Sequence, residues 1–179
     1  MTDFTFYTKE TASDKAKPIL EEIQKGFGFV PNIFAYMAEA PTTLEAYLSL
    51  NEIIERTSFT PEQQQIALLA ASVENNCDFC TVAHRAVGKM KKVNQQTLDA
   101  LNNKSQIDNT QEAALAKFTQ TVVKERGQLS EDTLTEFLSA GFTKQQILEV
   151  MIIVSIKTLS NYINHLTNPE PNKELLSMV

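Results

Sequence analysis

Apolar residues recur along this chain at intervals of three and four positions, the spacing of one face of an α-helix. Ala16, Ile19, Leu20 and Ile23 form the first such stripe, and no segment shows the alternation typical of a half-buried strand. Helices are expected to open at or near Ser13, Pro31, Pro41, Thr60, Cys77, Gln95, Thr110, Ser130 and Thr143. The pattern predicts an all-α fold, a single-domain helical bundle.

The clearest helix start is Thr60-Pro61-Glu62, with a capping threonine, a proline at the first helical position and an acid in the first turn. This helix is expected to end at Asn75-Asn76, and the next one begins near Cys77. Gly88 and the lysines after it are expected to close that second helix. Both cysteines of the chain should therefore lie on a central helix.

Length and composition place the chain among ordinary globular domains. It has 179 residues, of which 42% are hydrophobic and 21% charged, enough for one domain with a sizeable core. We expect an irregular lead-in over residues 1–12, a helical domain over 13–170 and a tail over 171–179. The net charge of −6 and the absence of a basic run disfavour nucleic acid and anionic membranes as partners.

Nothing in the sequence predicts export or a membrane anchor. The first ten residues lack the apolar core of a signal peptide. The longest apolar run, over residues 150–156, is much shorter than the ~20 residues that span a bilayer. The expected location is the cytoplasm, where a pair of cysteines points to catalysis or metal binding rather than to a structural disulfide.

The candidate chemistry is concentrated in Cys77, Cys80 and His84. In a helix these residues stand at i, i+3 and i+7 and project from one face. A thiolate is stabilised near a helix N-terminus, and the imidazole one turn beyond Cys80 can accept its proton. We expect Cys80 to attack an O–O bond and Cys77, the more exposed thiol, to resolve the sulfenic acid to a disulfide.

Two other interpretations of this cluster stay open. His165 would complete a two-cysteine, two-histidine zinc set, although three ligands from one helical face converge poorly on a tetrahedral ion. The cysteines can also be simple packing residues. Phe79 between them is interpreted as a core or cavity-wall residue, and His165 as a polar residue of the last helix.

Residues 77–84 match a C-x-[YF]-C-x-x-x-H pattern and resemble the AhpD-like alkylhydroperoxidases of the carboxymuconolactone decarboxylase superfamily. The stretch from Gly28 to Phe34 is similar to the G-x-V-P-N-x-F lead-in of the peroxidase-related branch. The last helix is similar to that branch in the following positions: Glu149, Leu159, Asn161, Asn164 and His165. The resemblance covers most of residues 11–168.

The resemblance implies an all-helical subunit built around a helical hairpin and assembled into homo-trimers or hexamers. It implies that the two cysteines and the histidine work with a glutamate twelve residues before the first cysteine. It also implies a dithiol reductant, a lipoyl-bearing or thioredoxin-like protein, and no metal or flavin cofactor.

This chain departs from the pattern at the relay position, where Gln65 replaces the glutamate. An amide can orient a hydrogen-bond partner but cannot carry a proton away. Glu74, Glu62 and Glu149 are the candidate substitutes, and Glu74 is the nearest to the cysteines in sequence. We include Cys77, Cys80, His84, Gln65 and Glu74 in the predicted site.

The resulting prediction is a thiol-dependent peroxidase of antioxidant defence that reduces hydrogen peroxide or organic hydroperoxides through Cys77 and Cys80. A non-catalytic redox sensor or disulfide-exchange protein is the main alternative, favoured by Gln65. A lactone decarboxylase would want clustered basic residues for a carboxylate substrate, and Arg56, Arg85 and Arg126 are scattered. A zinc-bound module is the remaining alternative.

Overall fold

A computed structural model describes residues 3–179, and these form α-helices and connecting segments without a β-strand. The helices are α1 Ala16–Phe27, α2 Asn32–Met37, α3 Pro41–Glu55, α4 Pro61–Glu74, α5 Asp78–Met90, α6 Gln95–Asn103, α7 Thr110–Lys124, α8 Glu131–Ser139, α9 Lys144–Thr167 and α10 Lys173–Leu176. The predicted all-α, single-domain fold is confirmed.

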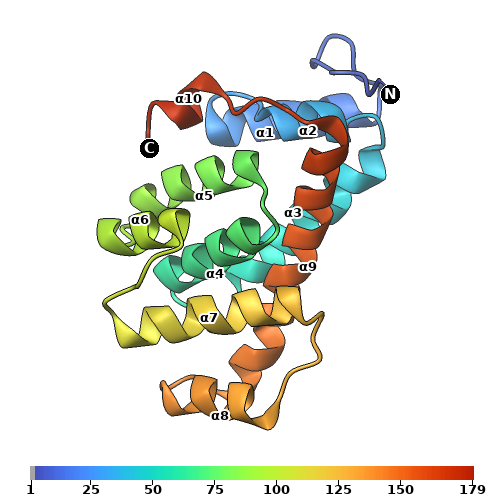
Figure 1. The fold of residues 1–179 in the computed structure, drawn as a ribbon. Helices are drawn as coiled ribbons and strands as arrows, with labels where there is room; N and C mark the ends of the chain where they lie inside the picture. Colours follow the sequence, from blue (N-terminus) through green and yellow to red (C-terminus); the bar gives the residue numbers. More distant parts are fainter. Residues whose placement is uncertain (1–2) are drawn as a thin grey trace.

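Helix α4 is the centre of the bundle (Figure 1). It contacts α3, α5, α6, α7 and α9, and every residue from Gln64 to Val73 is buried. A helix apolar on all sides must be surrounded by other elements, which is why its neighbours cover it completely. Helix α4 thereby fixes Gln65, one of the predicted site residues, in the interior.

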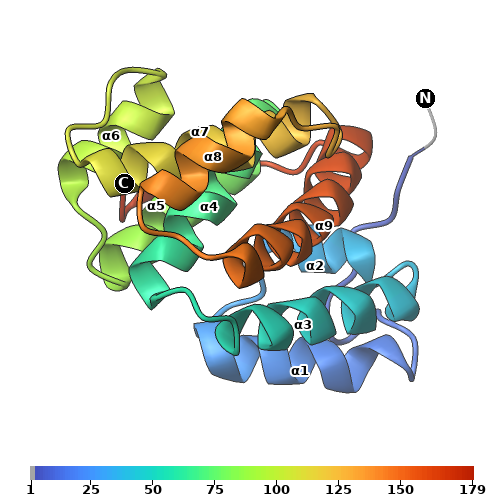
Figure 2. The ribbon, with the colours of Figure 1, turned by 90° about the horizontal axis from the view of Figure 1, so that it is seen from below.

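Two apolar clusters share the interior. The larger one joins α4 to α7 and α9 and includes Leu69, Phe118 and Ile153. The smaller one joins α1, α2 and α3 to the start of α5 and includes Leu20, Leu44 and both cysteines. Figure 2 shows α1 and α3 lying side by side beneath α9 and α2. The cysteines therefore lie in the part of the core nearest the N-terminal helices.

Helix α9 is the longest element and runs past α3, α4 and α7. The whole helix is long enough, and with a mean hydropathy of 1.2 apolar enough, to cross a membrane. The apolar run over residues 150–156 alone is too short to do so. Lys157 and Asn161 of this helix are buried. Both side chains lie close enough to Cys80 to affect its pKa.

Three local expectations are corrected. Gly88 lies inside α5, where an added Cβ would stand 2.8 Å from Leu98 Cδ2, so its role is close packing against α6. Pro31 is the N-cap of α2 and not its first residue. The segment 171–179 contains α10, which packs against α5 through buried Leu175.

The start of α4 can be tested by a stability measurement. Thr60 Oγ1 accepts a hydrogen bond from Gln63 N, and Gln63 Oε1 accepts one from Thr60 N. Thr60→Ala removes this capping box, and we expect the free energy of unfolding to fall by about 1 kcal/mol. Urea denaturation measures the change. A free energy of unfolding equal to that of the wild-type protein within error would show that the capping box does not stabilise α4.

Candidate active site

Cys77 forms the N-cap of α5, so the helix begins near Cys77 as predicted, and Cys77 itself precedes the helical turns in which the i, i+3, i+7 spacing applies. Its backbone is extended, with φ −98° and ψ 97°, and Asn76 before it has a left-handed φ of 55°. The turn between α4 and α5 is closed by a hydrogen bond from Cys77 N to Ser72 O, at 3.0 Å. Cys80 then lies in the first turn of α5, where free backbone N–H groups favour a negative charge.

Both cysteines are free thiols and both are buried. Cys77 is 2% exposed and Cys80 is 3% exposed, so both sulfurs lie below the surface, and neither thiol is exposed as the sequence analysis expected for Cys77. The Asn164 amide donates to both sulfurs, at 3.0 Å to Cys80 Sγ and 3.5 Å to Cys77 Sγ. One side chain of α9 therefore holds the two sulfurs of α5 together.

The two thiols differ in acidity. The Cys77 thiol donates to Cys80, and this hydrogen bond, followed by the positive charge of Lys157, brings the pKa of Cys80 well below its usual value despite burial. The same hydrogen bond, burial and the nearby negative charge raise the pKa of Cys77. Cys80 is therefore the more acidic thiol and Cys77 the one that keeps its proton, the order that the predicted attacking and resolving roles require.

Lys157 is the residue that the sequence analysis missed. It is 1% exposed and enters the site from α9, with Nζ 2.9 Å from His84 Nε2. The sequence did carry a signal, because Lys157 is a lone charge directly after the most apolar run of the chain. A buried charged lysine needs partners that compensate for its lost hydration. Here the Cys80 thiolate provides an opposite charge and the His84 imidazole a hydrogen-bond acceptor.

His84 contacts Lys157 and Gln65, and its predicted direct partnership with Cys80 is not observed among the described residues. Its Nδ1 is 3.1 Å from Gln65 Oε1. An amide oxygen only accepts, so Nδ1 carries the proton and Nε2 presents its lone pair to the Lys157 ammonium. Burial and then the Lys157 charge hold the pKa of His84 well below its usual value, so the imidazole is neutral.

The candidate substitutes for the relay glutamate lie elsewhere. Glu74 lines a groove between α6 and α7 that contains neither cysteine, so its place in the predicted site is wrong. Glu149 accepts hydrogen bonds from Ser58 N and Ser58 Oγ at the connection between α3 and α4. Glu62 lies in the first turn of α4. Gln65 is thus the group that contacts His84 at the relay position.

Two buried amide atoms beside the sulfurs have no hydrogen-bond partner among the described residues: Asn161 Nδ2 and Asn164 Oδ1. The other end of the Asn161 amide is fixed, because Asn75 Nδ2 donates to Asn161 Oδ1 at 2.9 Å. Asn161 nevertheless lies close enough to Cys80 to help lower the pKa of that thiol.

Cys80 opens onto a cavity of about 450 Å³ between the N-terminal helices and α5. Its walls are mainly aromatic and aliphatic, with Phe34 packed edge-on against Tyr47 at a centroid distance of 5.2 Å. The polar groups that reach it include Gln65, His84 and Lys157. The cavity can hold an apolar molecule with its reactive end at Cys80.

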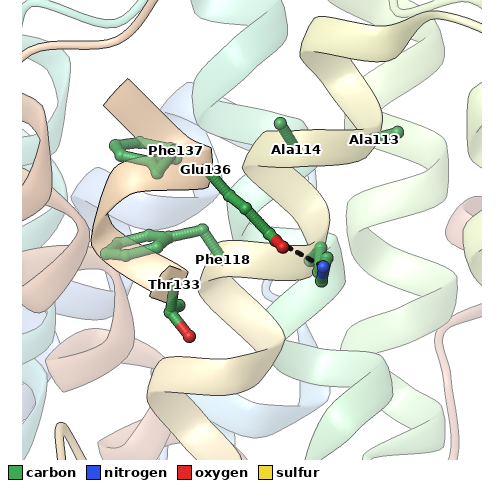
Figure 3. A pocket seen from close by; sticks show the side chains of 7 residues that line it. Ala113, Ala114, Phe118, Thr133, Glu136 and Phe137 are labelled. Atoms are coloured by element: carbon green, nitrogen blue, oxygen red, sulfur yellow. Dashed lines mark hydrogen bonds and ion pairs between the residues drawn. The ribbon is translucent and has the colours of Figure 1, made fainter. Parts of the chain in front are cut away.

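A smaller hollow of about 150 Å³ lies between α7 and α8 and is shown in Figure 3. Its walls include Phe118 and Phe137, stacked at a centroid distance of 4.1 Å, and the Lys117–Glu136 ion pair lies beside them. Neither a cysteine nor a histidine lines it. Of these two hollows, the Cys80 cavity is therefore the one that contains predicted site residues.

The two histidines lie on different sides of the cysteine pair. His84 lines the Cys80 cavity, whereas His165 is exposed on α9 and lines a different hollow beside Cys77. Within residues 3–179 the cysteine, histidine, aspartate and glutamate side chains form no group of three suited to a metal ion. The arrangement is that of a dithiol beside a buried lysine.

Residues 41–122, which include the cysteine motif, match the carboxymuconolactone decarboxylase family. This segment belongs to that family. It spans α3 to α7 and so holds Gln65, both cysteines and His84, whereas Lys157 and Asn164 lie beyond it. A comparison with curated proteins finds no significant sequence match.

Several solved structures share the fold of this chain. A peroxidase-related protein with an AhpD core from Ralstonia eutropha JMP134 is 23% identical, with a TM-score of 0.86 over 98% of this chain and 94% of that one. A peroxidase-related protein from Silicibacter sp. TM1040 is 18% identical, with a TM-score of 0.81 over 97% and 92%.

The debrominase Bmp8, solved as a cysteine-to-alanine variant with 2,3,4-tribromopyrrole, has the same fold. It is 18% identical, with a TM-score of 0.81 over 99% of this chain and 96% of that one. These likenesses extend almost from end to end, so they confirm the AhpD core fold that the sequence resemblance predicted.

Proposed function

We propose that this protein is a thiol-dependent peroxidase that reduces hydroperoxides through a Cys77–Cys80 dithiol–disulfide cycle. The observation that carries the proposal is the Cys80 thiol with its lowered pKa, placed beside Lys157 and facing an apolar cavity. A thiolate is the nucleophilic form of cysteine, and a neighbouring cation maintains it at neutral pH.

The first step transfers one oxygen. The Cys80 thiolate attacks the terminal oxygen of the hydroperoxide, the O–O bond breaks, and Cys80 becomes a sulfenic acid. The leaving alkoxide takes a proton from the Lys157 ammonium, which is 2.9 Å from His84. The product is an alcohol.

The second step closes the disulfide. Cys77 attacks the Cys80 sulfenic sulfur, and its proton leaves with the hydroxyl group as water. An external dithiol then reduces the disulfide. Its two protons return to Cys77 and to Lys157, while Cys80 is restored as a thiolate. We also propose, from the family resemblance, a lipoyl-bearing or thioredoxin-like reductant, a homo-trimer or homo-hexamer, and an antioxidant role in the cytoplasm.

The proposal is tested by the number of thiols that one equivalent of cumene hydroperoxide removes. The wild-type protein should lose two thiols within seconds, and dithiothreitol should restore both. Cys80→Ser should lose none on that timescale, because burial still raises the pKa of Cys77 and Cys77 does not line the apolar cavity. Rapid peroxide consumption by the Cys80→Ser variant would overturn the proposal.

The matched variant Cys77→Ser separates attack from resolution. It should consume one equivalent of peroxide and stop at a Cys80 sulfenic acid, which dimedone traps. Fast disulfide formation with slow turnover under excess dithiothreitol would instead identify a redox sensor. Turnover that continues at the rate of disulfide formation supports an enzyme.

Reductive dehalogenation is a second candidate function, favoured by the aromatic walls of the Cys80 cavity. Here the Cys80 thiolate attacks a ring bromine, and the ring carbon takes a proton from Lys157. Cys77 then displaces bromide from the Cys80 sulfur to form the same disulfide, and its proton passes to the neutral Lys157 amine. The test is bromide release from 2,3,4-tribromopyrrole by the reduced protein. None of the three arginines lines the cavity, so a lactone carboxylate would find no arginine partner there.

A further inference from the structure

The two cysteines open onto different hollows of the molecule. Cys80 lines the apolar cavity and Cys77 does not, whereas Cys77 lines a second cleft of about 260 Å³ that does not include Cys80. The second cleft lies between the start of α5 and the end of α9. Phe79 lines both hollows and forms the partition between them.

We infer that the oxidant and the reductant reach the cysteine pair from opposite sides. The hydroperoxide meets Cys80 through the apolar cavity, and a slender dithiol enters the cleft and attacks Cys77. This inference rests on the proposed dithiol–disulfide cycle and adds to it a separate reductant site. We call this hollow the Cys77 cleft.

The walls of the two hollows suit different molecules. The Cys77 cleft is lined mainly by polar and charged residues: Asn76, Asp78, Asn164, His165, Asn168 and Glu170. Lys104 adds a charge at its edge through a hydrogen bond to Asn76. The Cys80 cavity is lined largely by aromatic and aliphatic side chains. The Cys77 cleft therefore suits a hydrated thiol, and the Cys80 cavity suits an apolar hydroperoxide.

The size of the Cys77 cleft limits what can carry the attacking thiol. Cys77 is only 2% exposed, so its sulfur lies below the molecular surface. A hollow of about 260 Å³ admits a small thiol or a narrow arm that bears one. A thiol that lies flush with the surface of a folded domain would stop short of the sulfur. The occupant is thus a slender dithiol.

The chemistry of exchange favours attack at Cys77. The external thiolate forms a bond to Cys77 Sγ, the Cys77–Cys80 bond breaks, and the electron pair leaves with Cys80. Cys80 is the better leaving group because Asn164 and Lys157 stabilise its thiolate. The second thiol of the reductant then releases Cys77, which regains its proton. The reductant becomes a disulfide and the protein a dithiol.

Three variants on the two sides test the separation. His165→Trp places a large ring over the Cys77 cleft, and Val87→Phe narrows the Cys80 cavity. Leu166→Trp is the control, because it places a tryptophan at an exposed position that lines neither hollow. Oxidation by cumene hydroperoxide and reduction by dithiothreitol are timed separately, by counting free thiols in acid-quenched samples.

We expect His165→Trp to slow reduction about tenfold and leave oxidation unchanged, because it blocks access only to Cys77. Val87→Phe should slow oxidation and leave reduction unchanged, and Leu166→Trp should change neither rate. The inference is overturned if His165→Trp slows oxidation, or if it leaves reduction as fast as in the Leu166→Trp control.

A direct map of the attacked sulfur gives a second measurement that needs no variant. Oxidised protein is mixed with one equivalent of glutathione, quenched in acid, and the mixed disulfide is located by fragmentation between the two cysteines. Glutathione on Cys77 supports the inference, and glutathione on Cys80 overturns it. The disulfide is made with diamide, so this test stands even if hydroperoxides fail to oxidise the protein and the proposed function falls.

Discussion

Replacing Lys157 by methionine should move the pH dependence of Cys80 oxidation upward by about 1–3 units, the usual effect of one close opposite charge. The hydrogen bond from Cys77 and then the Lys157 charge hold the pKa of Cys80 below its ordinary value of 9.0, so the wild-type thiolate persists as the pH falls through the neutral range. Without that charge the thiolate is lost at higher pH. Below the new pKa, the oxidation rate should fall about tenfold for each pH unit.

The measurement is the rate of thiol loss with cumene hydroperoxide between pH 5 and 9. Methionine nearly matches the length of lysine but leaves His84 Nε2 without its donor, so thermal unfolding should show a folded variant with a somewhat lower midpoint. Lys89→Met, at an exposed position of α5, is the matched control and should follow the wild-type profile. Superimposable profiles for Lys157→Met and wild type would show that Lys157 does not set the acidity of Cys80.

The helix boundaries were predictable because their signals are local. Thr60, Asn109, Ser130 and Thr143 each accept a hydrogen bond from a backbone N–H two or three residues later. Such a cap depends on the residue type and on the next turn alone. The spacing of Cys80 and His84 on α5 follows from helical geometry in the same way.

The partners of the cysteines were not predictable from local spacing. Lys157 is 73 positions from His84, and Asn164 is 84 positions from Cys80, so only the packing of α9 against α4 and α5 brings them together. Glu74 was chosen for its closeness in sequence. The end of α4 carries it instead to the groove beside α6 and α7, because neighbouring positions on a helix face different directions.

The burial of Cys77 was also missed, and the reason is the N-cap position. A helical residue one turn before Cys80 would share its face, but the extended backbone of Cys77 turns this residue towards Asn164 and the end of α9. That backbone depends on the left-handed Asn76 before it. The sequence shows two asparagines at this point and does not distinguish a cap from a continuing helix.

Gln65→Glu should restore the missing acid and raise the pKa of His84 by about 1–3 units. Gln65 Oε1 is 3.1 Å from His84 Nδ1, so a carboxylate in its place would accept the same hydrogen bond and add an opposite charge. Burial and the Lys157 charge currently keep His84 neutral. A charged partner at Nδ1 opposes both effects, so His84 should take up a proton at a higher pH than it does now.

Two-dimensional NMR of the imidazole signals measures this titration, and His165, the other histidine, is an exposed internal reference. Gln63→Glu makes the same change two positions earlier on α4, away from His84, and should leave both titrations unchanged. With an acid–base pair completed beside Lys157, peroxide turnover under excess dithiothreitol should rise by about tenfold or more. An unshifted His84 signal would refute the Gln65–His84 contact, and a shifted signal with unchanged turnover would show that proton transfer does not limit the cycle.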